Sequence, residues 1–364
     1  MHISKEQLLF DLYVAYYAAR KGKGGKHYVK NFDKHLHENL ITLRDSIFNR
    51  TYTPGVFTCF IITHPKKREI FASKFVDRIV HHLYYMYVHK YFENTFINDC
   101  YSCIKGRGTS YGIKRLRHHI LAESQNYKKK CWALKLDISS YFMSINREIL
   151  LKIVKEELEK IKQKTQTLDF ELLEFLSEKI IDNDPTKNCF VLAKKEEYLG
   201  LSKGKSLFTC KRGCGLPIGN LTSQLFSNVY LNRLDQYVKR KLKMRHYGRY
   251  VDDLFIVSTD KGKLLDCISK IRTFLQGELG LELNEWKTVL NEAERGVEFL
   301  GAFLKPNRTY VSNQCLRRIR TKISTDKKCK TKEQLRQSYI SRLGFMRQFS
   351  SYNVSKKLFY KIGP

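Results

Sequence analysis

The sequence predicts an α+β fold in which helices alternate with short strands. Apolar residues recur at helical spacing in the segments 5–20, 74–92 and 262–276. The segments 132–138 and 247–257 are instead rich in residues typical of strands, and the second can form a hairpin. A chain of 364 residues, 42% of them hydrophobic, can bury a sizeable core, so we expect one divided domain or two to three linked lobes.

The charge balance favours a polyanionic partner. The chain has 67 Lys and Arg residues against 36 Asp and Glu residues, a formal net charge of +31, which is far more than solubility requires. The basic residues are spread along the chain rather than confined to a tail, which indicates a long track for nucleic acid. Charge alone does not make a basic protein an enzyme. Since no run approaches the ~18 apolar residues of a membrane span, we expect no membrane insertion.

The ten cysteines indicate a reducing compartment, because no secretory signal pattern precedes them. We therefore expect a cytoplasmic protein. Cys100 and Cys103 have the spacing of a metal knuckle, but the next pair, Cys210 and Cys214, lies more than a hundred residues away without paired histidines. Free thiols are the simpler interpretation, and zinc remains the alternative.

The first third of the chain alternates helices with a basic hairpin. The glycine- and lysine-rich segment 21–28 ends the first helix, and a second helical segment covers 31–48. Residues 52–71 predict extended segments on either side of a basic turn. Lys66 and Arg68 would then project near a strand end.

The same alternation continues to the C-terminus. A glycine-rich basic turn at 106–109 leads into a helix, and it either binds phosphate or simply begins that helix. The strand WALKLDI carries Asp137 at its end, where an acid can reach a cleft. Helical periodicity over 147–183 is followed by a polar connection at 184–214. The remaining segments are a helix after a glycine turn (215–242), the strand-like pieces 279–288 and 296–304, and basic helices from about 312.

Asp252 and Asp253 stand side by side between apolar flanks that can pair, which places both at a hairpin tip. Adjacent carboxylates repel one another and oppose burial, so a cation or solvent must compensate them. By itself the pattern also fits an ordinary acidic turn. Asp137 adds a third acid on a separate strand. Three carboxylates can hold two Mg²⁺ ions ~3.5–4 Å apart, the arrangement used for phosphoryl transfer onto a 3′-hydroxyl.

Five motifs occur in the order in which reverse transcriptases carry them. LKLDISSYF, GLPIGNLTSQ, YVDD, LNEWKT and VEFLG resemble the palm motifs of that family, and the match extends from about residue 52 to 303. The resemblance implies a right-hand polymerase: fingers, a palm whose antiparallel sheet carries the YVDD hairpin and is flanked by helices, and a helical thumb. The implied division is 1–130 for the N-terminal segment and fingers, 131–304 for the palm with the inserted connection, and 305–364 for the thumb.

The resemblance also implies site residues. Asp137 and Asp252 are the principal metal ligands, with the carbonyl of Ile138 beside them and Asp253 as the supporting acid, for two Mg²⁺ ions or, alternatively, Mn²⁺. The implied nucleotide contacts are Lys66, Arg68, Ser140, Tyr141, Phe142, Ile218, Gly219, Gln224 and Lys287. The turn that grips the primer end corresponds to Phe299, Leu300 and Gly301.

Several of these roles have a structural alternative. Lys66 and Arg68 suit a triphosphate by charge and fork geometry, and a solvated basic turn is the alternative. Backbone N–H groups of Ser140 and Tyr141 would face the same phosphates. Phe142 corresponds to the bulky residue that rejects a 2′-hydroxyl, or it belongs to the core. Lys287 corresponds to a lysine near the departing pyrophosphate.

Other features resemble the reverse transcriptases of diversity-generating retroelements. Many reverse transcriptases have glutamine in place of Ile218, and group II intron enzymes have Ser-Pro in place of Ser223-Gln224. GLPIGNLTSQ, KSLF and RYVDD resemble the retroelement enzymes. That family copies a template-repeat RNA with errors at adenines, and the cDNA replaces a variable region of a target gene. Loss of an amide beside the nascent base pair would weaken rejection of wrong pairs, unless Ile218 only packs the motif turn.

The implied partners are the template RNA, the RNA–cDNA hybrid, dNTPs and a small basic accessory protein that forms a pentamer. The host would be bacterial or archaeal, or the gene phage-encoded. The 63 residues after Gly301 suffice for a helical thumb but not for an RNase H or endonuclease domain. Two alternatives remain: a retron-like, intron-derived or antiphage reverse transcriptase, and an inactive RNA-binding protein with a polymerase fold. The sequence identifies neither the template nor the target gene.

Overall fold

A computed structural model describes residues 2–63 and 66–359. The chain forms two compact units, each made of three segments. The first unit contains Met1–Ile97, Ile138–Tyr237 and Thr273–Glu282. The second contains Asn98–Asp137, Val238–Arg272 and Leu283–Pro364. The predicted division into fingers, palm and thumb cuts the chain differently and stays a prediction.

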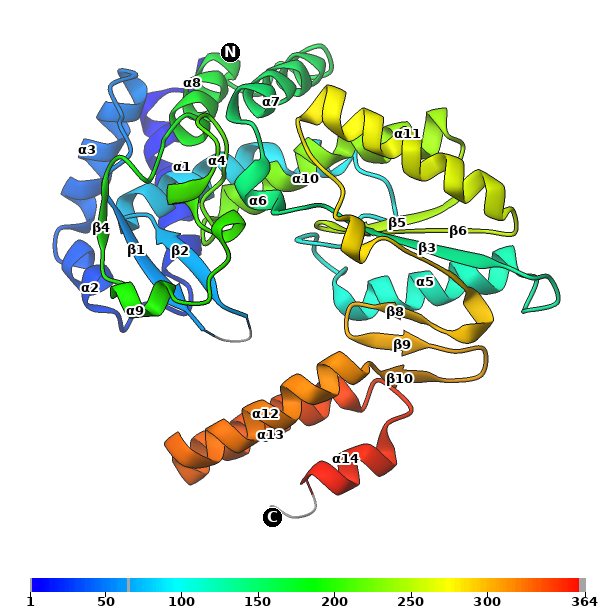
Figure 1. The fold of residues 1–364 in the computed structure, drawn as a ribbon. Helices are drawn as coiled ribbons and strands as arrows, with labels where there is room; N and C mark the ends of the chain where they lie inside the picture. The colour runs from blue at the N-terminus through cyan, green and yellow to red at the C-terminus, as the bar shows by residue number, and fades with distance from the viewer. Residues whose placement is uncertain (1, 64–65, 360–364) are drawn as a thin grey trace. The chain divides into compact units, whose positions relative to one another are not determined.

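The first unit is mainly helical (Figure 1). Its helices are α1 (Lys5–Arg20), α2 (His27–Asp33), α3 (Leu36–Phe48), α4 (Phe75–Glu93), α6 (Tyr141–Ser144), α7 (Arg147–Lys162), α8 (Phe170–Ile181) and α10 (Leu221–Gln236). Two predicted helices are each divided: the segment 31–48 is interrupted before α3, and 147–183 separates into α7 and α8. The second division has a local cause, because the side chain of Asp169 accepts the N–H of Leu172 and caps a new helix.

A three-stranded sheet completes this unit. β1 (Phe57–Ile62) pairs antiparallel with β2 (Arg68–Ala72) and parallel with β4 (Cys189–Val191). The segment 184–214 is therefore more than a polar connection, since it supplies a strand and the short helical pieces α9 (Lys195–Tyr198), η1 (Lys203–Lys205) and η2 (Leu207–Thr209). β4 is three residues long and has no buried residue, so it lacks the alternation that marks a strand in sequence.

The second unit contains a four-stranded antiparallel sheet in the order β5-β6-β3-β7. Figure 1 labels β5, β6 and β3. Its strands are β5 (His246–Tyr250), β6 (Asp253–Ser258), β3 (Trp132–Asp137) and β7 (Val289–Glu292). Helix α5 (Thr109–Glu123) packs on β5 and β6. Buried residues of α5, β3 and β6 form one hydrophobic cluster, which packs the helix against this sheet. The predicted strand at 279–288 is wrong, because its end forms the turn η4 (Glu285–Lys287) and β7 begins after it.

The rest of the second unit combines a small sheet with helices. The elements are β8 (Val297–Phe299), β9 (Ala302–Leu304), β10 (Thr309–Val311), α12 (Asn313–Cys329), α13 (Lys332–Met346) and α14 (Tyr352–Phe359). The carboxylate of Asp326, fully buried in α12, joins α12 to α13 through Ser338 and Arg342. Three further elements complete the chain: the π-helical turn η3 (Tyr237–Lys241), α11 (Lys261–Leu279) and η5 (Ala293–Arg295). Among the described residues, no helix is both long enough and apolar enough to cross a bilayer.

Candidate active site

Strand pairing brings the three predicted aspartates together in the second unit. β3 ends at Asp137 and β6 begins at Asp253, and these two residues are direct partners across the antiparallel pair. Val251 and Asp252 form the two-residue turn between β5 and β6. The predicted hairpin tip is therefore present, and the neighbouring strand carries the third acid beside it.

The cluster is charged and incompletely compensated. Burial, followed by the negative charges of Asp253 and Asp137, raises the pKa of the Asp252 carboxyl to about 6. Two lysines stand against the other acids: Lys287 Nζ lies 2.7 Å from Asp137 Oδ2, and Lys135 Nζ lies 3.8 Å from Asp253 Oδ1. Three carboxylates with two nearby ammonium groups leave an excess of negative charge for a cation.

Two residues beside the aspartates, Asn284 and Lys135, are not among the predicted site residues. Asn284 donates its backbone N–H to the Asp137 carbonyl at 2.8 Å, and its side-chain amide donates to Asp137 Oδ2 at 3.3 Å. The LNEWKT motif, which contains Asn284 and Lys287, was the available signal. Lys135 lies two residues before Asp137, and the period of a strand places both side chains on one face.

The donor set fits a hard divalent cation. Within the described part of the chain, no three Asp, Glu, His or Cys side chains stand close enough to form a metal cage by themselves. Mg²⁺ does not require such a cage, since it takes one or two carboxylates and completes its shell with water and substrate phosphates. Burial, and after it repulsion by Asp253 and Asp137, raises the pKa of Asp252, and a bound cation would offset both effects. Asp137, Asp252 and Asp253 are the residues that could hold it.

The segment after Asp137 belongs to the first unit. Ile138 follows Asp137 directly and is buried. Ser140 has a left-handed backbone (φ 47°) immediately before α6. The Tyr141 hydroxyl donates to the Ser227 carbonyl on α10, so Tyr141 anchors this turn. Phe142 is partly buried against an apolar cluster that includes Phe57, Phe71 and Leu207.

The GLPIGNLTSQ motif packs beside β2 in the same unit. The Ile218 side chain contacts the same apolar cluster as Phe142, and its carbonyl accepts the N–H of Phe71 at 3.2 Å. Gly219 has φ 124°, and a Cβ there would lie 3.1 Å from Ile70 Cγ2, so glycine is required. The Gln224 side chain is exposed on α10. Packing is thus one observed role of Ile218 and of Phe142, and a nucleotide role stays a prediction for both.

The basic hairpin of the first unit exposes its cations. Lys66 and Arg68 are both exposed, and Arg68 begins β2 opposite Ile62. The next residue, Glu69, is buried and accepts hydrogen bonds from Ser206 Oγ and the Leu207 N–H. Desolvation raises the pKa of the Glu69 carboxyl. This carboxylate ties β2 to η2, and the alternation of the strand directs Arg68 to the opposite side.

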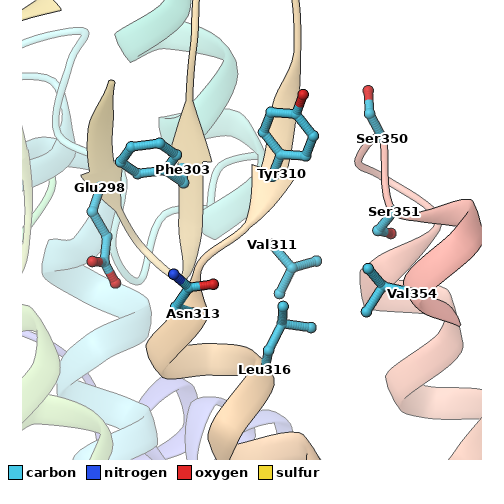
Figure 2. Close-up of a pocket in the computed structure, with 9 residues that line it drawn as sticks. All are labelled: Glu298, Phe303, Tyr310, Val311, Asn313, Leu316, Ser350, Ser351 and Val354. Carbon is cyan, nitrogen blue, oxygen red and sulfur yellow. The ribbon is translucent and has the colours of Figure 1, made fainter. Parts of the chain in front are cut away.

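The predicted primer-gripping turn connects β8 and β9 in the second unit. Phe299 is fully buried, and the turn residues Leu300 and Gly301 have φ values of 49° and 83°. A cavity of about 330 Å³ lies next to this sheet, between β8–β10 and the helices α12 and α14 (Figure 2). Its lining residues are Glu298, Phe303, Tyr310, Val311, Asn313, Leu316, Ser350, Ser351 and Val354. None of them is a predicted site residue, so this cavity is separate from the aspartates.

The cysteine pair does not form a knuckle with other ligands among the described residues. Cys100 is buried, and its Sγ accepts a hydrogen bond from Arg249 at 3.4 Å. Cys103 is exposed with φ 56°. The described cysteines form no disulfide bonds with one another, and zinc binding by Cys100 and Cys103 stays the alternative prediction.

The chain is similar to a known protein family over most of its length. The family described as reverse transcriptase (RNA-dependent DNA polymerase) matches residues 64–304, more than half of the chain. A curated relative, "Protein YkfC" of Escherichia coli (strain K12), is 24% identical over 296 residues, which cover 72% of this chain and 70% of that protein.

Solved structures of telomerases share the fold. An apo telomerase from Candida tropicalis, truncated from its C-terminal domain, matches with a TM-score of 0.50 and 14% identity, over 70% of this chain and 55% of that one. A telomerase from Candida albicans, solved with a fragment of telomeric RNA, matches with a TM-score of 0.51 and 13% identity, over 86% and 56%. The chain thus spans little more than half the length of these telomerases. The likeness confirms the predicted α+β, right-hand polymerase architecture.

Proposed function

The chain belongs to the reverse transcriptase family, the RNA-dependent DNA polymerases, and we propose that Asp137, Asp252 and Asp253 hold the divalent ions of that reaction. The predicted enzyme class is confirmed at the level of the family. The observation that carries the site assignment is the register of β3 and β6, which pairs Asp137 with Asp253 and sets Asp252 in the adjoining turn.

Each group has a definite task in this proposal. Two Mg²⁺ ions, when bound, would promote attack by the primer 3′-hydroxyl and neutralise the leaving pyrophosphate. Asn284 and Lys287 orient the Asp137 carboxylate through Oδ2. Lys66 and Arg68, both exposed cations, contact the triphosphate of the incoming dNTP. Leu300 and Gly301 hold the primer end.

Primer extension on an RNA template tests the assignment. Asp137→Asn should abolish incorporation of dNTPs, because it removes the negative charge of one metal ligand without changing the size of the side chain. Asp266→Asn is the matched control, since Asp266 forms an exposed pair with Lys270 on α11. If Asp137→Asn retained the activity of Asp266→Asn, the assignment would be wrong.

We further propose that the enzyme serves a diversity-generating retroelement, copying a template-repeat RNA into cDNA with errors at adenines for mutagenic retrohoming. The motifs GLPIGNLTSQ, KSLF and RYVDD support this. In this proposal the chain works in the cytoplasm on template RNA and the RNA–cDNA hybrid, with a pentameric basic accessory protein. A genome that lacks paired repeats differing at adenines near the gene would favour a retron-like, intron-derived or antiphage role instead.

The fidelity hypothesis concerns Ile218. Its side chain is apolar and packs against the same cluster as Phe142, so no amide stands at this position to restrain the nascent pair. Ile218→Gln should reduce misincorporation opposite template adenine, whereas Ile218→Val, which stays apolar and β-branched, should leave it high. Equal error rates in the parent, Ile218→Gln and Ile218→Val would refute the hypothesis.

A further inference from the structure

The turn that carries Asp252 has an unusual backbone. Val251 adopts φ 55°, in the left-handed region that a β-branched residue rarely enters. Asp252 is the next residue, so the backbone of Val251 determines where the Asp252 carboxylate points. A strained conformation of this kind persists only where neighbouring groups hold it in place.

A buried arginine holds one side of this turn. The Arg249 side chain is fully buried, and its Nη1 donates to the Val251 carbonyl at 3.2 Å. Its Nη2 donates to Cys100 Sγ at 3.4 Å. Burial of a guanidinium is unfavourable unless its donors find acceptors, so these contacts give the side chain a defined geometry.

A buried serine holds the other side. Ser102, which is 1% exposed, accepts the Val251 N–H on Oγ at 3.2 Å. The segment that carries Ser102 is itself fixed to β5, because Arg249 N–H donates to the Asp99 carbonyl at 2.8 Å and Tyr101 N–H donates to the Arg249 carbonyl at 2.9 Å. Both polar backbone groups of Val251 are therefore bound by side chains from anchored elements.

We propose that Arg249 and Ser102 are positioning residues that hold Val251 in its left-handed conformation and thereby aim the Asp252 carboxylate. The inference rests on the proposed function, which makes Asp252 a metal ligand. Neither residue touches the reacting atoms in this scheme. They act through the backbone of Val251, and a pre-set carboxylate binds a cation without first having to reorganise.

The substitution Val251→Gly tests whether Arg249 and Ser102 position Val251 or only support the fold in general. Glycine enters the left-handed region without strain, so Val251→Gly removes the need for the clamp. Its extra flexibility in the unfolded chain is the same in every background and cancels when variants are compared as a cycle. A merely structural role of Arg249 predicts no rescue by this glycine.

The experiment compares the parent with Arg249→Met, Ser102→Ala and Val251→Gly, and with each of the first two combined with Val251→Gly. Mn²⁺ binding is measured from the electron paramagnetic resonance signal of the free ion, and thermal unfolding is measured in EDTA. Arg249→Met should weaken Mn²⁺ binding about tenfold, and Ser102→Ala should weaken it less. Adding Val251→Gly should restore most of the lost affinity, and its effect on the melting temperature should be more favourable in each clamp variant than in the parent.

Arg107→Met is the matched control. Arg107 Nη1 donates to the Cys100 carbonyl at 2.8 Å in the same unit, whereas Arg249 and Ser102 bind the Val251 backbone. Any loss that it causes should not be rescued by Val251→Gly. If Arg249→Met does not fold, Ser102→Ala and its glycine double variant provide the same comparison.

Additive effects of Val251→Gly and the clamp variants would overturn the proposal. The proposed function is judged separately, from primer extension by Asp137→Asn. Rescue of Mn²⁺ affinity by Val251→Gly, with primer extension unaffected by Asp137→Asn, would support the clamp and refute the assignment of the metal site. Loss of primer extension in Asp137→Asn, without rescue by Val251→Gly, would support the metal site and refute the clamp.

Discussion

Two turns in the second unit each contain a left-handed backbone conformation, and different contacts stabilise it in each turn. Val251-Asp252 joins β5 to β6 and Leu300-Gly301 joins β8 to β9, and each turn puts a branched side chain at positive φ, 55° for Val251 and 49° for Leu300. Polar side chains bind the backbone of Val251. Leu300 instead packs against the buried core around Phe255 and Phe299.

The difference between the turns follows from their second residue. Asp252 carries a charge among other charges, and a turn that presents it needs fixed polar neighbours. Gly301 carries no side chain, adopts φ 83°, and its carbonyl accepts the Ser312 N–H at 2.8 Å. The Leu300-Gly301 turn presents no charged side chain, so apolar packing is enough to hold it. Directional hydrogen bonds hold the aspartate turn, so small changes in the neighbouring side chains should affect its function more than they affect the Leu300-Gly301 turn.

The largest expected effect separates the two turns by activity. Asp252→Asn should lower kcat for primer extension by about a thousandfold, roughly 4 kcal/mol of activation free energy, because a metal ligand loses its charge. Leu300→Ala should lower kcat by about tenfold or less, since that turn positions the primer rather than the metal. Single-turnover extension on one RNA template measures the rate for each variant. Equal losses of rate would show that the two turns do not differ in their effect on catalysis.

The second effect concerns stability and pH in EDTA. Because the pKa of Asp252 is raised from 3.8 to about 6, the folded state keeps this proton to higher pH than the unfolded state does. The free energy of unfolding should therefore fall as pH rises from about 4 through about 6, by about 2–3 kcal/mol at ~1.4 kcal/mol for each pKa unit.

Urea unfolding of the parent and of Asp252→Asn across this range isolates the contribution of Asp252. The variant has no carboxyl at this position, so the difference in unfolding free energy between the two proteins should grow in favour of the variant from about pH 4 to about pH 6 and stay constant at higher pH. A difference that is constant with pH would contradict the raised pKa.

A smaller effect belongs to the apolar turn. Gly301→Ala should lower the free energy of unfolding by about 1–2 kcal/mol, the usual strain of a side chain in the left-handed region. Space is sufficient, because the new Cβ would lie 3.5 Å from Phe345 and 3.6 Å from Cys315 Sγ. Thermal unfolding measures the loss. The Mg²⁺ concentration that gives half-maximal extension should stay unchanged, and a shift of it would mean that this turn also governs the metal.

The smallest effect on stability is expected at Lys287. Its side chain is 57% exposed, so Lys287→Gln should change the free energy of unfolding by less than about 1 kcal/mol. The charge of Lys287 lowers the pKa of Asp252, and its removal should raise that pKa further. The pH midpoint of the stability loss in EDTA should then move upward. An unchanged midpoint would show that the charge of Lys287 does not affect the pKa of Asp252.

Local patterns predicted much of this site. The apolar flanks of Asp252 and Asp253 indicate a hairpin because strand pairing across a short turn depends on nearby residues. The end of the strand at Asp137 is equally local, and the motif order identified the neighbours. The divided helices and strand β4 were missed, because capping bonds and parallel pairing to a distant strand leave weak periodic signals.

The amino-acid sequence supplies the chemical groups: one acid at the end of a strand and two at a hairpin tip, an excess of positive charge, and the motif order of a reverse transcriptase. The packing of distant segments fixes how these groups are held. It pairs Asp137 with Asp253, brings Lys287 and Asn284 to Asp137 across about 150 residues of chain, and buries Arg249, which composition alone would place in solvent. These contacts join segments far apart in sequence, and they form only when the strands and the helix beneath them pack together.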